Sequence, residues 1–183
     1  MIFNETVLKK MMKTEYKGHG LLVANKEGRI ILGGSWWVIS MDEEVFTKRA
    51  KASLVELTGC LPEQGECFRV TSAGCQMEIP HGYMDIDGKK DMIIQKKTCI
   101  KTDILIDSFN LVRVFRKEDQ MFFINELVSQ LLEPSCLTER EEEYIEGPLY
   151  EAGGCYWFNP YNSLMVLPVE DETLEEKLKE VTF

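Results

Sequence analysis

The chain has 183 residues, 44% of them hydrophobic and including nine Phe, nine Met and three Trp, which supplies a packed core and excludes a wholly disordered chain. Nowhere do eighteen apolar residues follow one another, which excludes a helix that spans a bilayer, and the formal net charge is −10. The sequence opens without a long apolar run or a cleavage site, so we expect no signal peptide and a cytoplasmic protein.

The negative charge is concentrated in the last third of the chain. Residues 1–60 hold nine basic and seven acidic residues, and residues 61–116 hold eight of each. Residues 117–183 hold four basic and sixteen acidic residues, a balance of −12. Such a surface repels nucleic acid phosphates and attracts basic grooves. It is typical either of a solvated face or of a surface that imitates nucleic acid and docks on a basic protein.

Apolar periodicity and turn residues predict the elements of the first half of the chain. Asn4 is the expected N-cap of a first helix that reaches about Tyr16. The S-x-x-E pattern from Ser40 to Glu43 predicts the capping box of a second helix, which ends at Gly59. The expected strands are Leu21–Ala24, Arg29–Leu32, Trp36–Ser40, Cys67–Ser72, Gln76–Ile79 and Met92–Ile94.

The same order of elements starts again near Thr98. A helix is expected over Asn125–Leu132, because its leucines and Val128 share one face and Pro134 stops it. Thr173 with Glu176 is the expected cap of a short last helix. The expected strands of this half are Thr98–Ile106, Leu111–Arg116, Gln120–Phe123, Tyr144–Glu151, Cys155–Asn159 and Leu164–Val169.

This order of elements predicts an α+β fold, mostly antiparallel sheet with few helices, built as two similar βββ-α-βββ lobes. The expected units are an N-terminal α+β lobe, 1–96, a C-terminal acidic α+β lobe, 97–170, and an acidic tail or short helix, 171–183. No residue-level repeat is visible, so the duplication is inferred from the order of elements alone.

Few residues are suited to acid–base or nucleophilic chemistry. Only His19 and His81 are present, and each lies in a turn beside Gly or Pro. Cys75 with His81 is the one pairing of a thiol with a base, but no third group orients it. We therefore expect no catalytic residues. A cysteine-dependent enzyme remains the alternative, in which changing either residue abolishes activity.

The sequence also predicts no metal and no cofactor. Cys60, Cys67, Cys75 and His81 lack the close C-x-x-C pairs of a structural zinc site. Residues 83–88 contain two Asp and a Gly but lack the terminal acids of a calcium loop, and no phosphate-binding glycine loop occurs. With no sign of secretion, we expect the six cysteines to be reduced thiols, several of them buried.

Aromatic residues adjoin one another in two strands. The side chains of Trp36 and Trp37 should point to opposite faces of one strand. The same holds in the second half for the adjacent residues Tyr156, Trp157 and Phe158. Either both faces of the sheet are covered, or an aromatic side chain is exposed as an interface anchor. We take Trp37 and Trp157 as the candidate anchors.

Two stretches resemble DNA sliding clamps, in which a helix ends at an L-P-E-G turn and a strand follows. The resemblance covers about forty residues, and it implies a ring with a basic inner face around DNA. The matching segments are Val45-Phe46, Leu54–Leu57, Leu61–Glu66, Gly147–Leu149 and Leu164–Val169.

In size, acidity and lack of a cofactor motif, the chain resembles small inhibitors from phages and mobile elements, among them anti-CRISPR proteins against type II RNA-guided nucleases. Those nucleases hold nucleic acid in positively charged channels that an acidic lobe can occupy. We therefore expect a binding protein that inhibits a nucleic-acid-processing enzyme. The alternatives are a clamp-like replication accessory protein and a structural or assembly subunit, and a homodimer fits any of these. The expected partner-binding residues are Glu139, Glu141, Glu142, Glu143, Glu146, Trp37 and Trp157.

Overall fold

The computed structural model describes residues 2–74, 76–78, 85–95, 98–108, 110–132 and 145–182. The helices in this part of the chain are α1 (Glu5–Lys17), α2 (Lys48–Thr58), α3 (Lys90–Ile94), α4 (Leu127–Leu131) and α5 (Glu172–Thr182). The strands are β1 (Leu21–Lys26), β2 (Arg29–Gly33), β3 (Trp37–Asp42), β4 (Cys67–Val70), β5 (Gln76–Glu78), β6 (Ile100–Asp107), β7 (Leu111–Lys117), β8 (Gln120–Asn125), β9 (Glu146–Glu151), β10 (Gly154–Phe158) and β11 (Asn162–Val166). The prediction of an α+β fold made mostly of antiparallel sheet is confirmed.

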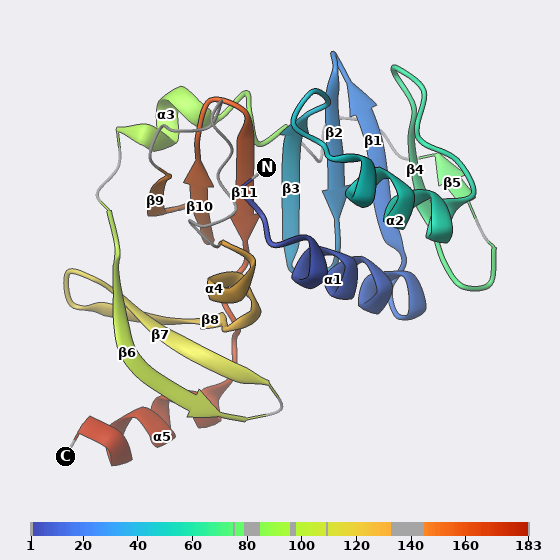
Figure 1. Cartoon of the computed structure of the whole chain (residues 1–183). Coiled ribbons are helices and arrows are strands. Elements are labelled where there is room, and N and C mark those ends of the chain that lie inside the picture. Colours follow the sequence, from blue (N-terminus) through green and yellow to red (C-terminus); the bar gives the residue numbers. More distant parts are fainter. Residues whose placement is uncertain are drawn as a thin grey trace.

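Most strands belong to one large sheet. Eight strands pair in the order β5-β4-β1-β2-β3-β11-β10-β9, and every neighbouring pair is antiparallel. Its centre joins distant parts of the sequence, because Ile39 of β3 lies opposite Leu164 of β11. Figure 1 shows this seam, where a strand from near the start of the chain lies beside one from near its end.

A second sheet of three strands, β6-β7-β8, lies beside the large one (Figure 1). An isolated bridge between Thr98 and Leu149 connects the two sheets, and the Cys99 N–H donates to the Pro148 carbonyl at 2.7 Å. The chain thus leaves the large sheet after β5, builds the small sheet, and returns to complete the large one.

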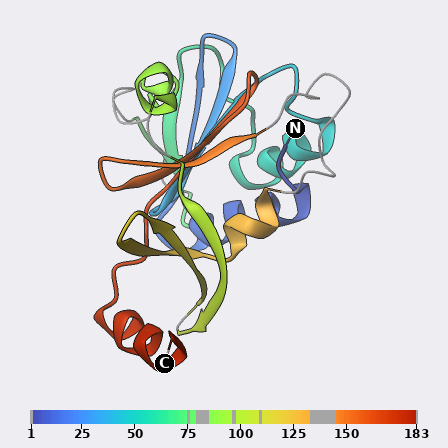
Figure 2. The same cartoon turned by 90° about the vertical axis from the view of Figure 1, so that its left-hand side faces the viewer.

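Helices cover both faces of the large sheet, as the edge-on view in Figure 2 shows. Successive residues of a strand point to opposite faces, so each strand contributes to two apolar layers. Helices α1 and α2 cover one face, where the main core lies, and α3 covers part of the other near β9 and β10. The main core includes Leu8, Met12, Val23, Leu32, Trp37, Ile39, Leu54, Trp157 and Leu164.

The small sheet is also covered on both faces. One face joins the main core through Phe115, Phe122 and Ile124. The other face packs on α5, whose Leu174 is fully buried in a separate cluster with Val114. The C-terminal residues therefore form the short helix that was one of the two alternatives for 171–183.

The first helix begins where the sequence predicts. The Asn4 side chain accepts the backbone N–H groups of Thr6 and Val7 at 3.0 and 3.2 Å, which satisfies two of the free donors at the helix start. The S-x-x-E prediction is wrong, because β3 continues through Ser40 to Asp42, and α2 starts later with Thr47 as its N-cap. Pairing with strands on both sides decides the conformation of Ser40, which a local motif cannot reveal.

The strand predicted over Met92–Ile94 is part of α3. Three apolar residues in a row fit a short strand and a single helical turn equally well, so periodicity cannot decide between them.

The two similar lobes are not what the structure shows. Strands β9–β11, which were assigned to the second lobe, complete the large sheet started by β1–β5, and only β6–β8 form a sheet of their own. The order of elements along the chain does not reveal which strands become neighbours. None of the helices in the described ranges is long and apolar enough to cross a membrane.

Candidate functional site

Four of the predicted partner-binding residues, Glu139, Glu141, Glu142 and Glu143, lie outside the described residues, as do Cys75 and His81. Glu146 is described: it begins β9, is half-buried, and lies opposite Phe158 of β10. The described acidic residues of the last third of the chain lie in 117–132 and 145–182.

The two predicted aromatic anchors are buried. Trp37 is 1% exposed and Trp157 is 5% exposed, and both belong to the main core. The expectation that they present a surface to a partner is therefore wrong for this chain. Trp36 lies just before β3 and is half-buried against the same core. Covering elements on both sides of the sheet decide this outcome, and one strand's sequence does not reveal them.

An acidic groove lies where the chain leaves the large sheet after β11. The Leu167 N–H donates to the Trp36 carbonyl at 2.8 Å, and the Val169 N–H donates to the Phe123 carbonyl at 2.7 Å. These bonds hold the segment between β11 and α5 beside β8. Asp171 lies directly before α5 and accepts the hydroxyl and the backbone N–H of Thr173 at 2.7 and 2.9 Å, so Asp171 caps the helix and the prediction that Thr173 does so is wrong.

The groove has a volume of about 450 Å³. Its walls are the acidic segment and the first turn of α5, and its floor is apolar and aromatic. Met121, with 46% of its surface exposed, contributes to that floor. The residues that line the groove are Met121, Phe122, Phe123, Tyr150, Gly153, Pro168, Val169, Glu170, Asp171, Glu172 and Glu175.

The charged residues in the described lining of the acidic groove are all of one sign. Four of the described lining residues are acidic and none is basic. The pKa of Asp171 lies below its ordinary value, because the hydroxyl and N–H of Thr173 stabilise the carboxylate. The floor is fixed by the stacked rings of Phe122 and Tyr150, whose centroids are 4.9 Å apart, and Lys117 holds the Tyr150 carbonyl at 3.0 Å. Such a groove suits a ligand that combines cations with apolar surface.

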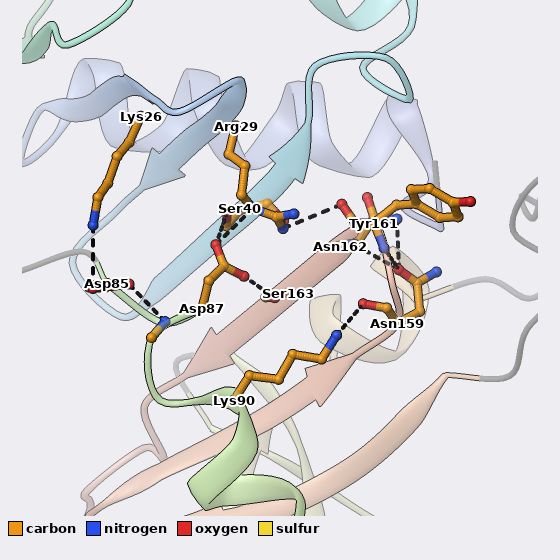
Figure 3. Close-up of polar contacts among 11 residues, drawn as sticks. Lys26, Arg29, Ser40, Asp85, Asp87, Lys90, Asn159, Tyr161, Asn162 and Ser163 are labelled. Atoms are coloured by element: carbon orange, nitrogen blue, oxygen red, sulfur yellow. Dashed lines mark hydrogen bonds and ion pairs between the residues drawn. The ribbon is translucent and has the colours of Figure 1, made fainter.

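A second polar cluster lies on the face of the large sheet that α3 covers (Figure 3). Asp87 accepts the hydroxyls of Ser40 and Ser163, each at 2.5 Å, and pairs with Arg29 at 2.8 Å. Arg29 also donates to the Ser40 hydroxyl at 2.8 Å. Since Ser40 and Ser163 face each other on β3 and β11, one carboxylate ties three strands to the loop before α3.

Neighbouring contacts extend this cluster. Lys26 pairs with Asp85 at 3.3 Å, and Asp85 accepts the Gly88 N–H at 2.8 Å. Lys90 donates to the Asn159 carbonyl at 3.0 Å (Figure 3). These bonds fix residues 85–90 on the sheet from both sides.

The serines in this cluster are not placed for nucleophilic attack. Ser40 is fully buried and Ser163 is 1% exposed, so a substrate cannot approach either hydroxyl. Each hydroxyl already donates to Asp87, whose charge Arg29 offsets. The chemistry this geometry supports is structural: it holds a loop to a sheet.

In the sequence, the run Glu170–Glu172 is evident only as part of the acidic last third of the chain. The apolar floor of the acidic groove comes from β8 and β9, and nothing in the local sequence connects those strands to the acidic run. The one sequence signal for such a groove is that the acidic run directly follows the apolar segment Leu167–Val169. Comparison of the chain with protein-family models gives no match, and comparison with curated proteins finds no similar one.

Proposed function

We propose that this chain is a non-enzymatic binding protein that holds a basic segment of a partner protein in the acidic groove. The observation that carries the proposal is the combination of four acidic side chains with an apolar floor and no basic side chain among the described lining residues. Lys and Arg suit such a groove, since their aliphatic stems cover apolar surface while their charged ends reach carboxylates.

More specifically, we propose that the partner is a nucleic-acid-processing enzyme and that binding inhibits the activity of that enzyme. Such enzymes hold nucleic acid in basic channels, and an RNA-guided nuclease is the concrete case. The excess of acidic residues in 117–183 supports this form, since carboxylates compete with phosphates for the same Lys and Arg side chains.

The binding test uses a labelled peptide of alternating Lys and Leu residues and measures its fluorescence anisotropy. The groove variant carries Glu170→Gln, Glu172→Gln and Glu175→Gln, and keeps Asp171 because it caps α5. The control variant carries Glu27→Gln, Glu63→Gln and Glu78→Gln, three exposed residues that give the same change in net charge.

We expect the peptide to bind the natural chain more weakly as salt rises, and the groove variant to bind it at least about tenfold more weakly. The control variant should stay within about twofold of the natural chain. Equal binding by the groove variant and the natural chain would show that the groove is not the binding surface.

The specific form has its own assay, cleavage of duplex DNA by a purified type II RNA-guided nuclease with and without the chain. Inhibition that the groove variant loses and the control variant keeps supports it. Cleavage unaffected by the natural chain at a large excess contradicts it and leaves the peptide result to decide the general proposal.

One observation favours a second candidate, the clamp-like accessory protein. Helices α1 and α2 pack side by side on one face of the large sheet, and one side of α1 carries Lys9, Lys10, Lys13 and Lys17, of which Lys9 and Lys13 pair with Glu56 of α2. Sedimentation of the chain with duplex DNA tests it: a ring-sized oligomer that retains DNA supports the clamp, and a monomer that does not retain DNA contradicts it. Self-association without DNA supports a structural subunit instead.

A further inference from the structure

A cavity of about 200 Å³ lies between the large and small sheets, away from the acidic groove, with which it shares no described lining residue. The cavity is partly open to solvent, so a small ligand can enter it from outside. The described residues that line it are Lys101, Phe115, Val128, Ser129, Leu132, Ile145, Gly147, Pro148 and Trp157.

The walls of the cavity are apolar and held in place by buried contacts. The rings of Phe115 and Trp157 meet edge to face with their centroids 6.3 Å apart, and Val128 of α4 is 1% exposed. On the β9 side, Gly147 has φ +129°, and a Cβ there would lie 2.5 Å from the Tyr156 carbonyl oxygen. A larger residue cannot be placed there without moving β9, so the backbone itself forms part of the wall.

The one cationic residue of the described lining is Lys101. It lies opposite Phe115 in the β6–β7 register, is exposed, and reaches the cavity. The nearby carboxylate of Glu126 is already held by two hydrogen bonds from Arg113, each 2.6 Å long. The charge of Lys101 interacts with that of Glu126, but no ion pair joins these two side chains.

We propose that this cavity binds a small monocyclic carboxylic acid, with the ring against the wall formed by Phe115 and Trp157 and the carboxylate beside Lys101. An apolar cavity of about 150 Å³ in another protein holds benzene, so a single ring fits the volume here. The proposal rests on a cavity and a cation that the acidic groove does not use, so it stands apart from the proposed function.

Phenylacetate is the probe, and benzyl alcohol is the neutral probe with the same ring. Binding is followed in the whole chain by shifts of backbone amide signals in two-dimensional NMR. We expect saturable shifts with phenylacetate, centred on residues that line the cavity. Shifts that do not saturate, or that lie elsewhere in the chain, would overturn the proposal.

Lys101→Met tests the role of the charge, and Lys10→Met, an exposed residue on α1, is the control for net charge. We expect Lys101→Met to weaken phenylacetate binding at least about fivefold with benzyl alcohol unchanged, and Lys10→Met to change neither. Equal weakening of both probes, or of neither, would contradict a carboxylate site at Lys101.

Val128→Phe fills the cavity and should abolish binding of both probes. Because overpacking of a buried position can disturb folding, Leu132→Phe, at a half-buried position in the same wall, is the second filling variant. A folded filling variant that binds phenylacetate as tightly as the natural chain would place the ligand elsewhere and overturn the proposal.

Discussion

Asp87 is the shared acceptor of a cluster that joins β2, β3 and β11, and its replacement measures what the cluster contributes to stability. Asp87→Asn keeps the shape of the side chain but removes the charge that faces the partly buried Arg29. We expect it to lower the free energy of unfolding by about 2 kcal/mol, because the guanidinium group loses its counter-ion and one serine loses its acceptor.

Urea unfolding at neutral pH measures this loss. Asp85→Asn is the matched control, since Asp85 pairs with the exposed part of Lys26 and an asparagine can still accept the Gly88 N–H. The control should cost less than about 1 kcal/mol. Equal losses from the two variants would mean that the contacts of Asp87 with the serines and Arg29 add nothing.

A second prediction at the residue scale concerns Glu126, whose ion pair with Arg113 should make the free energy of unfolding depend on pH. Burial disfavours its charged form, but the two hydrogen bonds and the charge of Arg113 outweigh burial, so the pKa of Glu126 lies below its ordinary value of 4.5. A carboxyl group whose pKa is lower in the folded state stabilises the fold fully above the unfolded value. That stabilisation is lost as pH falls through the folded value.

We therefore expect Glu126→Gln to cost about 3 kcal/mol at neutral pH, since it leaves Arg113, only 13% exposed, without its partner. Urea midpoints measured between about pH 6 and pH 3 should converge for the natural chain and the variant, because acid removes the same ion pair. Glu180→Gln, at an exposed position on α5, is the control. A constant gap between the two curves across this range would contradict the prediction.

At the scale of elements, α5 packs on the small sheet with Leu174 fully buried, and Lys177 donates to the Asp107 carbonyl of β6 at 2.7 Å. Leu174 packs among Ile106, Val112, Val114 and Phe123. We expect Leu174→Ala to lower stability by about 3 kcal/mol and, by loosening α5, to weaken peptide binding in the acidic groove without any change of charge. Leu167→Ala, at an exposed position of the same segment, should change the unfolding energy by less than about 0.5 kcal/mol. Unchanged peptide binding in a folded Leu174→Ala chain would show that the groove does not depend on α5.

The elements that the sequence predicts well are those whose residues decide their own conformation. The turn at Glu27 and Gly28 separates two apolar strands, and Asn4 caps α1 with its own side chain. Ser40 and the run Met92–Ile94 were predicted wrongly because distant strands and burial decide them. The acidic groove belongs to the second group. Its charges are evident in the sequence, but its floor comes from strands that only the fold brings together.

At the scale of the whole molecule, the large sheet unites residues from both predicted lobes. A fragment of residues 1–96 would lack β11, the partner of β3, and would expose apolar residues such as Ile39. We expect this fragment to be unfolded or aggregated, with few dispersed signals in two-dimensional NMR, whereas the whole chain gives a dispersed spectrum. A fragment that unfolds cooperatively would show that the first lobe is an independent unit.

The pairing of β3 with β11 also has a consequence for the order of events on the ribosome. More than half of the 183 residues separate the two strands, so β3 leaves the exit tunnel long before its partner has been translated. During that interval β3 is an unpaired edge strand, although it lies in the middle of the finished sheet. It can pair with β11 only after the last part of the mRNA has been translated. Contacts between such distant residues form slowly. The newly made chain should therefore depend on chaperones that shield strand edges, and truncation by a late stop codon should be as damaging as an early one.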